Sequence, residues 1–164
     1  MTIGELNVSS RAAFVDAVGW VFEHSPWVAE RVWDRRPFDD VDHLHATMVA
    51  EVARATRDEQ IRLLRAHPDL GARTSMSVAS TGEQAGAGLN RVSASEHGSL
   101  QQLNAAYREK FGFPFVLAVK GSTPAQVVDA LRERLPRELD EERTEALAQV
   151  YRIARFRLDD LIRT

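Results

Sequence analysis

The sequence contains no cysteine among its 164 residues. Disulfides, thiolate zinc sites and cysteine nucleophiles are therefore excluded. It also has no apolar run approaching the roughly 20 residues that a membrane-spanning helix needs. Residues 1–5 have neither the basic region nor the apolar run of a signal peptide. We therefore expect a cytoplasmic protein that has no membrane partner.

An excess of charge of either sign is missing as well. The 21 basic and 24 acidic residues give a formal net charge of -3 and are well mixed along the chain. Such a balance offers no electrostatic reason to expect nucleic acid as a partner. Apolar residues make up 44% and charged residues 27%, which is ordinary for a globular protein. We expect a single domain, residues 1–164, with a core that needs neither metal nor disulfide support.

Several catalytic motifs are absent. The chain has no phosphate-binding glycine loop, no Gly-x-Ser-x-Gly elbow and no His-Glu-x-x-His. His43 and His45 lie two residues apart in a helical pattern, so their side chains point about 200° apart and cannot share a metal. The sequence therefore supports no metal, nucleotide or serine-nucleophile site.

Helical periodicity fills most of the chain, and the expected fold is all-α. Capping residues followed by apolar side chains at three-and-four spacing predict about seven to eight helices. They are expected from Ser9 or Ser10 to Phe22, Trp27 to Arg35, Asp39 or Asp40 to Ala55, Thr56 to His67, Ser93 to Phe111, Thr123 to Leu135 and Asp140 to Ile162, with a short turn from Ser80 to Leu89.

Two stretches break this helical pattern. Residues 71–82 are small and polar, with Thr74 and Ser75 among them, and are interpreted as a functional loop that ends where Ser80 caps a short turn with Glu83. Residues 113–119 form the most apolar run and are expected to be a short buried extended segment. Because no second strand is expected to pair with this segment, its backbone groups need other partners, and a bound ligand is one candidate.

Arg157 falls within the apolar stripe of the last predicted helix, four residues from both Ile153 and Leu161. An arginine that points inward needs a carboxylate, carbonyls or a ligand. A buried structural ion pair, or a side chain that reaches past the edge of the helix to water, would also explain it.

His67 precedes a proline at a predicted helix end, and Glu83-Gln84 follow a short loop later. Histidine suits proton transfer near neutral pH, although many histidines at helix ends do no more than interact with the last carbonyls. Glu83 has a structural explanation too, because it fits the capping box with Ser80. Convergence of His67, the carboxylate-amide pair Glu83-Gln84 and Arg157 would favour catalysis.

The order of these motifs resembles that of the 2-oxo-4-hydroxy-4-carboxy-5-ureidoimidazoline (OHCU) decarboxylases. The similarity covers nearly the whole chain. It is carried by His67-Pro68-Asp69-Leu70-Gly71, by Ser80-Thr81-Gly82-Glu83-Gln84 with Gly88-Leu89, by Asn104 to Phe115, by Phe22 to Trp27 with Arg36-Pro37-Phe38, and by Tyr151 to Leu158.

The resemblance implies an all-α enzyme without a cofactor that converts OHCU to (S)-allantoin in the last step of urate breakdown. It implies that His67 is the proton donor and that Glu83 contacts the substrate, where we expect it to accept from N–H groups. The implied substrate contacts are Pro68, Ser80, Thr81, Gly82, Gln84, Phe115, Val116, Leu117, Ala118, Val119 and Arg157. A homodimer is also compatible with the family.

Two alternatives remain open at the level of sequence. One is a non-catalytic helical interaction module, in which His67 and residues 71–82 form an edge that binds a partner. The other is a metal-free lyase or hydrolase that acts on a related ureide.

Overall fold

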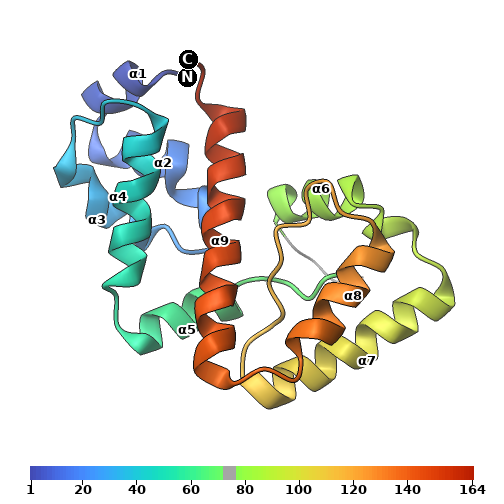
Figure 1. The fold of residues 1–164 in the computed structure, drawn as a ribbon. Helices are drawn as coiled ribbons and strands as arrows, with labels where there is room; N and C mark the ends of the chain where they lie inside the picture. The colour runs from blue at the N-terminus through green and yellow to red at the C-terminus, as the bar shows by residue number, and fades with distance from the viewer. Residues whose placement is uncertain (72–76) are drawn as a thin grey trace. The chain divides into compact units, whose positions relative to one another are not determined.

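The computed structural model describes residues 1–71 and 77–164, and these are largely helical, which confirms the all-α prediction (Figure 1). They contain nine α-helices and three short 3₁₀ helices, and no β-strand. The α-helices are α1 (Ile3–Val8), α2 (Arg11–Val18), α3 (Trp27–Val32), α4 (Val41–Ala53), α5 (Arg57–Arg65), α6 (Val78–Gly86), α7 (Ala94–Phe111), α8 (Pro124–Arg134) and α9 (Leu139–Leu161); the 3₁₀ helices are Gly19–Val21, Trp33–Arg35 and Leu89–Arg91.

The chain divides into two compact units. The first unit comprises Met1–Ala66 together with Val150–Thr164, and the second comprises His67–Gln149. Helix α9 runs through the boundary, so its N-terminal part belongs to the second unit and its C-terminal part to the first. A single functional domain over residues 1–164 stays a prediction.

In the first unit, helices α1 to α5 and the end of α9 surround an apolar core. The rings of Phe14 and Phe38 stack with centroids 6.1 Å apart, and Met48 and Leu158 are fully buried. The backbone N–H of Arg163 donates to the Met1 carbonyl over 2.7 Å, so the two termini lie side by side (Figure 1).

In the second unit, aromatic rings from α7 and from the chain that follows it form the centre of the core. Tyr107 lies between Phe111 and Phe115, with ring centroids 4.5 Å and 5.3 Å away. Val127 and Leu131 of α8 are fully buried. Burial of these side chains supplies most of the driving force for folding this unit.

Helix starts follow the predicted caps closely. Ser10, Asp40, Thr56, Ser93 and Thr123 each accept a hydrogen bond from the N–H three residues on. Helix α1 was not predicted, although Thr2 and Glu5 form a complete capping box. Its six residues carry one buried apolar side chain, Leu6, so periodicity is too weak to reveal it.

The predicted loop over residues 71–82 is wrong from Val78 onward. Helix α6 begins there, and its cap is Ser77, whose side chain accepts from the Ser80 N–H over 3.1 Å. Ser80 therefore lies inside the helix rather than capping a turn. The predicted loop residues Thr74 and Ser75 lie outside the described residues.

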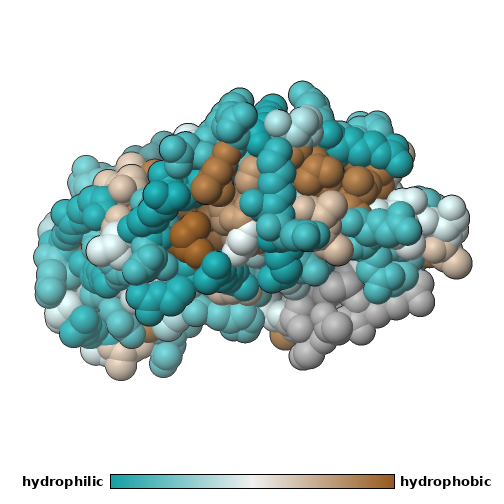
Figure 2. Space-filling view, turned by 90° about the horizontal axis from the view of Figure 1, so that it is seen from below, coloured by the Kyte–Doolittle hydropathy of each residue, from teal (hydrophilic) through white to brown (hydrophobic). Residues whose placement is uncertain are grey.

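On the face drawn in Figure 2, hydrophilic side chains predominate and apolar patches lie among them. Among the described helices, none is long and apolar enough to cross a membrane.

Candidate functional site

His67 lies immediately after α5 and its C-cap Ala66, and its side chain is buried, with 7% of its surface exposed. The turn that follows is held at three consecutive residues. Arg108 Nη2 donates to Asp69 Oδ1 over 2.8 Å, and Asn104 Nδ2 donates to the Leu70 carbonyl over 2.9 Å. The third contact is the hydrogen bond from the Gly71 N–H to Gln84 of α6. The turn next to His67 and Pro68 is therefore held by side chains of both α6 and α7.

Gln84 has a defined amide orientation. Its Oε1 accepts the Gly71 N–H over 2.8 Å, and its side chain is buried. Since the oxygen is occupied by a backbone donor, the amide NH₂ is the group that Gln84 can offer to a ligand. The positive φ of Gly71, 74°, brings its backbone into this position, and a Cβ there would lie 3.0 Å from Leu100.

The predicted residues of α6 separate onto two faces. Ser80 and Gln84, one helical turn apart, are buried, and Glu83 beside them is half-buried. Thr81 and Gly82 are exposed, and the Thr81 hydroxyl donates to the Ser77 carbonyl over 2.9 Å within the helix. The structure thus groups Ser80, Glu83 and Gln84 and leaves Thr81 and Gly82 outside that group.

Residues 114–119 are neither helix nor strand and run as an extended trace between α7 and α8 (Figure 1). Phe115, Val116, Ala118 and Val119 are buried, as predicted, and Leu117 is half-buried.

Two side chains that the sequence interpretation missed bond to the backbone of this segment. Arg134 Nη1 donates to the Val116 carbonyl over 2.7 Å, and the Ala118 N–H donates to Gln149 Oε1 over 3.1 Å. The expectation that a ligand would satisfy the segment's backbone is therefore corrected at these two groups. Protein side chains satisfy them.

Helix α7 connects the held turn with this segment. Asn104, Tyr107 and Arg108 lie at i, i+3 and i+4 and so share one face of the helix. Asn104 and Arg108 hold the turn that follows His67, whereas Tyr107 packs its ring against Phe115 at 5.3 Å. The two stretches with predicted substrate contacts are thus anchored within about one helical turn of each other.

A buried polar cluster supports the same segment. Arg134 Nε donates to Glu142 Oε1 over 2.5 Å, and the Tyr107 hydroxyl donates to the same oxygen over 2.6 Å. The guanidinium carbon of Arg134 lies 4.4 Å from the centroid of the Phe115 ring. Burial, reinforced by the hydrogen bond to Glu142, raises the pKa of Tyr107 well above its ordinary value. Removing one partner of a buried ion pair typically costs about 3–5 kcal/mol, so this cluster strongly constrains the local structure.

The signal for these missed residues was present in the sequence. Arg134 follows Val127 and Leu131 at helical spacing, as Arg157 follows Ile153, and all of these side chains are buried in the structure. A charged residue in an apolar stripe indicates an internal partner. Which partner it meets depends on the packing of α8 against α7 and the segment.

In the first unit, Arg157 is buried, with 3% of its surface exposed, as its position in the stripe predicts. Its Nη2 donates to Glu23 Oε2 over 2.8 Å, and its Nη1 lies 3.3 Å from the carbonyl oxygens of Trp20 and Val21. The structural explanation, a buried ion pair with carbonyls, is therefore present. A substrate contact by Arg157 stays a prediction.

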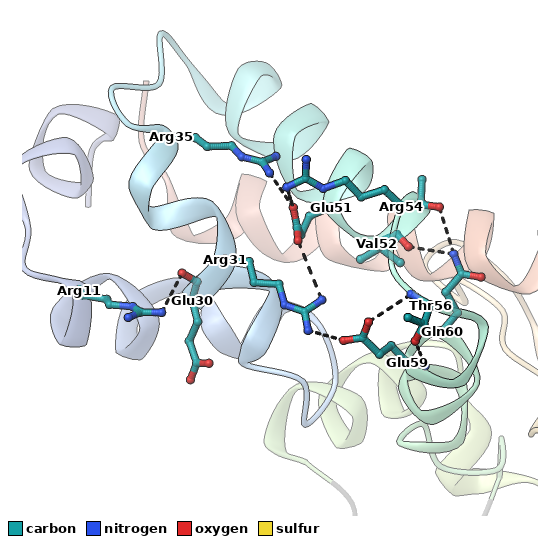
Figure 3. A network of polar contacts seen from close by, with 11 residues as sticks. Arg11, Glu30, Arg31, Arg35, Glu51, Val52, Arg54, Thr56, Glu59 and Gln60 are labelled. Carbon is teal, nitrogen blue, oxygen red and sulfur yellow. Dashed lines mark hydrogen bonds and ion pairs between the residues drawn. The ribbon is translucent and has the colours of Figure 1, made fainter.

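A second charged network in the first unit involves no predicted site residue (Figure 3). The buried carboxylate of Glu51 on α4 is paired with Arg31, Arg35 and Arg54. Arg31 also pairs with Glu59. The hydrogen bond from Arg31, with those from Thr56, lowers the pKa of Glu59 to about 2. Because each of these arginines already has a carboxylate partner, the network is a structural tie between α3, α4 and α5.

Metal binding finds no support in this part of the chain. Within residues 1–71 and 77–164, no three histidine, aspartate or glutamate side chains are grouped so as to hold an ion. The predicted site residues His67, Ser80, Glu83 and Gln84 are instead hydrogen-bonding side chains of the kind that fix a polar organic molecule.

Comparison with known proteins points to one family. The model of the OHCU decarboxylase family matches residues 7–159. The 2-oxo-4-hydroxy-4-carboxy-5-ureidoimidazoline decarboxylase of Haloferax volcanii is 47% identical over 158 residues, which are 96% of this chain and 94% of the relative. The uric acid degradation bifunctional protein PucL of Bacillus subtilis is 43% identical over 98% of this chain, which spans 33% of that longer protein.

Solved structures agree with this similarity. A crystal structure of (S)-allantoin synthase superposes with a TM-score of 0.82 at 31% identity, covering 99% of this chain and 54% of that chain. This chain therefore spans about half the length of that protein. A crystal structure of OHCU decarboxylase in the presence of (S)-allantoin superposes with a TM-score of 0.73 over 93% of this chain and 98% of that one. At 22% identity, this second match supports the fold alone.

Proposed function

Because the chain belongs to the OHCU decarboxylase family and is a carboxy-lyase of urate degradation, we propose that His67 protonates the intermediate that forms when OHCU loses carbon dioxide. The product of this step is (S)-allantoin. The observation that supports the proposal most directly is the held turn, in which three side-chain contacts at Asp69, Leu70 and Gly71 restrain the backbone next to His67.

Decarboxylation sets two requirements for a site. The bond between C4 and the carboxylate breaks, carbon dioxide leaves, and the electron pair moves into the adjacent C5=N bond of the imidazoline, which is conjugated with the C2 carbonyl. An enolate-like intermediate results, and donors already aimed at its oxygen lower the barrier because the charge develops in the transition state. The ureido-bearing ring carbon, C5, must then receive a proton, while the C4 hydroxyl gives up its proton and becomes a ring carbonyl. An acid held on one face of the ring delivers that proton stereospecifically.

His67 suits the second requirement. Imidazole exchanges protons near neutral pH, and a positioned acid typically contributes about 10²–10⁴-fold to the rate. Because the side chain is buried, competing proton delivery by bulk water is reduced. His67 therefore acts as the acid, and its position determines the (S) configuration.

Gln84 and Glu83 suit binding of the ureide. The amide NH₂ of Gln84 donates to a substrate carbonyl, since its oxygen is held by Gly71. The carboxylate of Glu83 accepts from ring or ureido N–H groups and orients the ring. Pro68, Ser80 and the backbone of residues 115–119 complete the proposed contacts.

Substitution of His67 tests the proposal. The substrate is generated in situ from urate with urate oxidase and hydroxyisourate hydrolase, and (S)-allantoin is followed by circular dichroism. Wild-type protein is expected to accelerate its appearance, whereas His67→Asn is expected to lower the rate by about 10²–10⁴-fold while remaining folded. The matched control is His97→Asn on α7, which should retain activity. Near-normal turnover and stereochemistry in His67→Asn would remove His67 from this role.

A further inference from the structure

Arg134 and Gln149 both act on the backbone of residues 115–119 from the same side. Arg134 bonds to the carbonyl of Val116, and Gln149 bonds to the N–H of Ala118. In an extended chain, the N–H and C=O of one residue point to one edge, and those of the next residue point to the other. Val116 and Ala118 therefore face the edge that α8 and α9 hold.

The backbone groups of Leu117 consequently face the opposite edge, as does the N–H of Val119. Among the described residues, no hydrogen bond reaches the N–H of Leu117 or Val119, although Val119 is buried and Leu117 is half-buried. The Val119 carbonyl is used by Ser122, which closes the following turn over 2.9 Å. Buried N–H donors normally have a partner in a native structure. Within residues 1–71 and 77–164 these two N–H groups therefore have no acceptor, and a ligand can supply one.

We propose that Gln149 and Arg134 are positioning residues, which hold residues 115–119 so that the N–H groups of Leu117 and Val119 meet the developing negative charge of the substrate. The inference rests on the proposed function, since it assigns a task to a segment of the same site. Neither residue touches the substrate.

Arg134 is itself held. Glu142 accepts from its Nε, and the Tyr107 hydroxyl donates to the same carboxylate oxygen. Phe115 packs on the guanidinium at 4.4 Å and on Tyr107 at 5.3 Å, so both the side chain and the backbone of the segment are restrained. Gln149 is held by Glu145, whose Oε1 accepts from its Nε2 over 2.9 Å. A misplacement of about 1 Å in such a support can cost about 10²-fold in rate.

Gln149 offers the sharper test, because replacement of Arg134 would leave Glu142 buried without its cation and would endanger folding. Gln149→Met keeps the length and the apolar stem but leaves the Ala118 N–H without an acceptor. We expect kcat and kcat/KM to fall together by roughly ten- to a hundredfold, because a contact made in the transition state is weakened. The Ala118 amide should also exchange its hydrogen faster.

Rescue distinguishes positioning from general stability. The double variant Glu145→Gln/Gln149→Glu exchanges the two side chains. A carboxylate oxygen at position 149 then accepts from the Ala118 N–H, and an amide at position 145 donates to that carboxylate. It is expected to recover most of the lost kcat. Val127→Ala, a core truncation in α8, should lower Tm without changing kcat at temperatures where it is folded. If Gln149→Met does not fold, Gln149→Asn keeps the amide but shortens its reach, and the same loss is expected.

The outcomes separate this inference from the proposed function. Wild-type kcat in folded Gln149→Met or Gln149→Asn would overturn the positioning role, as would a loss that the exchanged pair does not rescue. The proposed function is tested with other proteins. It would be overturned if the wild-type protein did not accelerate (S)-allantoin formation, or if His67→Asn kept the wild-type rate. Loss in Gln149→Met with rescue by the exchange supports the inference.

Discussion

A single hydrogen bond decides what Gln84 can do chemically. An amide side chain offers both a donor and an acceptor, and its orientation determines which of the two faces a ligand. Here the Gly71 N–H occupies the oxygen, so the NH₂ group remains available for a ligand. At the scale of one residue, Gln84 is a donor, complementary to a carbonyl.

Gln84→Glu tests this polarity. The carboxylate keeps an oxygen for the Gly71 N–H but replaces the donor with a second acceptor, which repels a substrate carbonyl. We expect kcat/KM for OHCU to fall by roughly ten- to a hundredfold, since leaving a buried polar group unsatisfied costs about 1–3 kcal/mol. Steady-state kinetics with freshly generated substrate measure it.

The matched control is Gln126→Glu at the start of α8. Gln126 Oε1 accepts from the Thr123 N–H in a capping box that glutamate can also form, so the charge change is the same and the cap survives. This control should retain wild-type kinetics. Equal kcat/KM in the two variants would show that the Gln84 amide donates nothing to the substrate.

Arg157 is the second residue whose chemistry is specific. Its guanidinium holds Glu23 and lies against two carbonyls, and lysine keeps the charge but loses the planar fork. If Arg157 also binds the substrate, as the family similarity implies, Arg157→Lys should raise KM about tenfold or more, whereas a purely structural arginine would lower Tm and leave KM unchanged.

Arg155→Lys serves as its control. Arg155 lies on the same helix and pairs with Asp42 and Asp159 near the surface. Its replacement should leave KM unaltered. An unchanged KM and kcat in Arg157→Lys, measured beside this control, would restrict Arg157 to the ion pair with Glu23.

At the scale of elements, α7 acts as the scaffold of the candidate site. Its predicted cap and its predicted end are both found, with Ser93 and Glu96 in a capping box and Gly112 in the left-handed conformation. Local signals of this kind act within a few residues, which explains why the sequence locates the helix so well. The side chains that α7 presents to the turn and to Phe115 are decided by packing.

Helix α6 shows where local signals become ambiguous. Both Ser77 and Ser80 are followed by residues compatible with capping, and the sequence interpretation selected Ser80 because Glu83 completes the capping box. The structure uses Ser77 instead. A start at Val78 adds a turn to the helix and buries Ser80 and Gln84 on one face, where Gln84 can reach Gly71. This tertiary contact lies beyond the reach of a local pattern.

At the scale of the whole molecule, both tyrosines of the chain are held protonated. Burial raises the pKa of Tyr107 and of Tyr151, and for Tyr107 the hydrogen bond to Glu142 adds to it. The folded state therefore binds these protons more tightly than the unfolded chain. The resulting stability is fully present below about pH 10, the ordinary tyrosine pKa, and is lost as the pH rises above it.

An alkaline titration checks this linkage. Ultraviolet absorbance of tyrosinate should stay low through about pH 10, where an ordinary tyrosine is half ionised, and should rise together with unfolding in far-ultraviolet circular dichroism. Tyrosinate that forms at its ordinary pH while the helical signal is unchanged would contradict the raised pKa of the two tyrosines.

The sequence by itself determined the all-α class, most helix boundaries, the buried extended segment and the place of Arg157 in an apolar helix stripe. These features depend on caps, on apolar periodicity and on proline or glycine, all of which act between near neighbours in the chain. The order of the His67, Glu83-Gln84 and Phe113-Pro114-Phe115 motifs was also sufficient to indicate the family.

Only the tertiary structure decided which groups pair. The partner of Arg157 is Glu23, 134 residues away, and the carbonyl of Val116 is met by Arg134 rather than by a ligand. The amide NH₂ of Gln84 is left as its available group because the N–H of Gly71, 13 residues earlier, donates to the amide oxygen. A periodic pattern reveals that a polar side chain is buried, and the cost of burial requires a partner. The identity of that partner depends on how the helices pack, which brings together residues far apart in the chain.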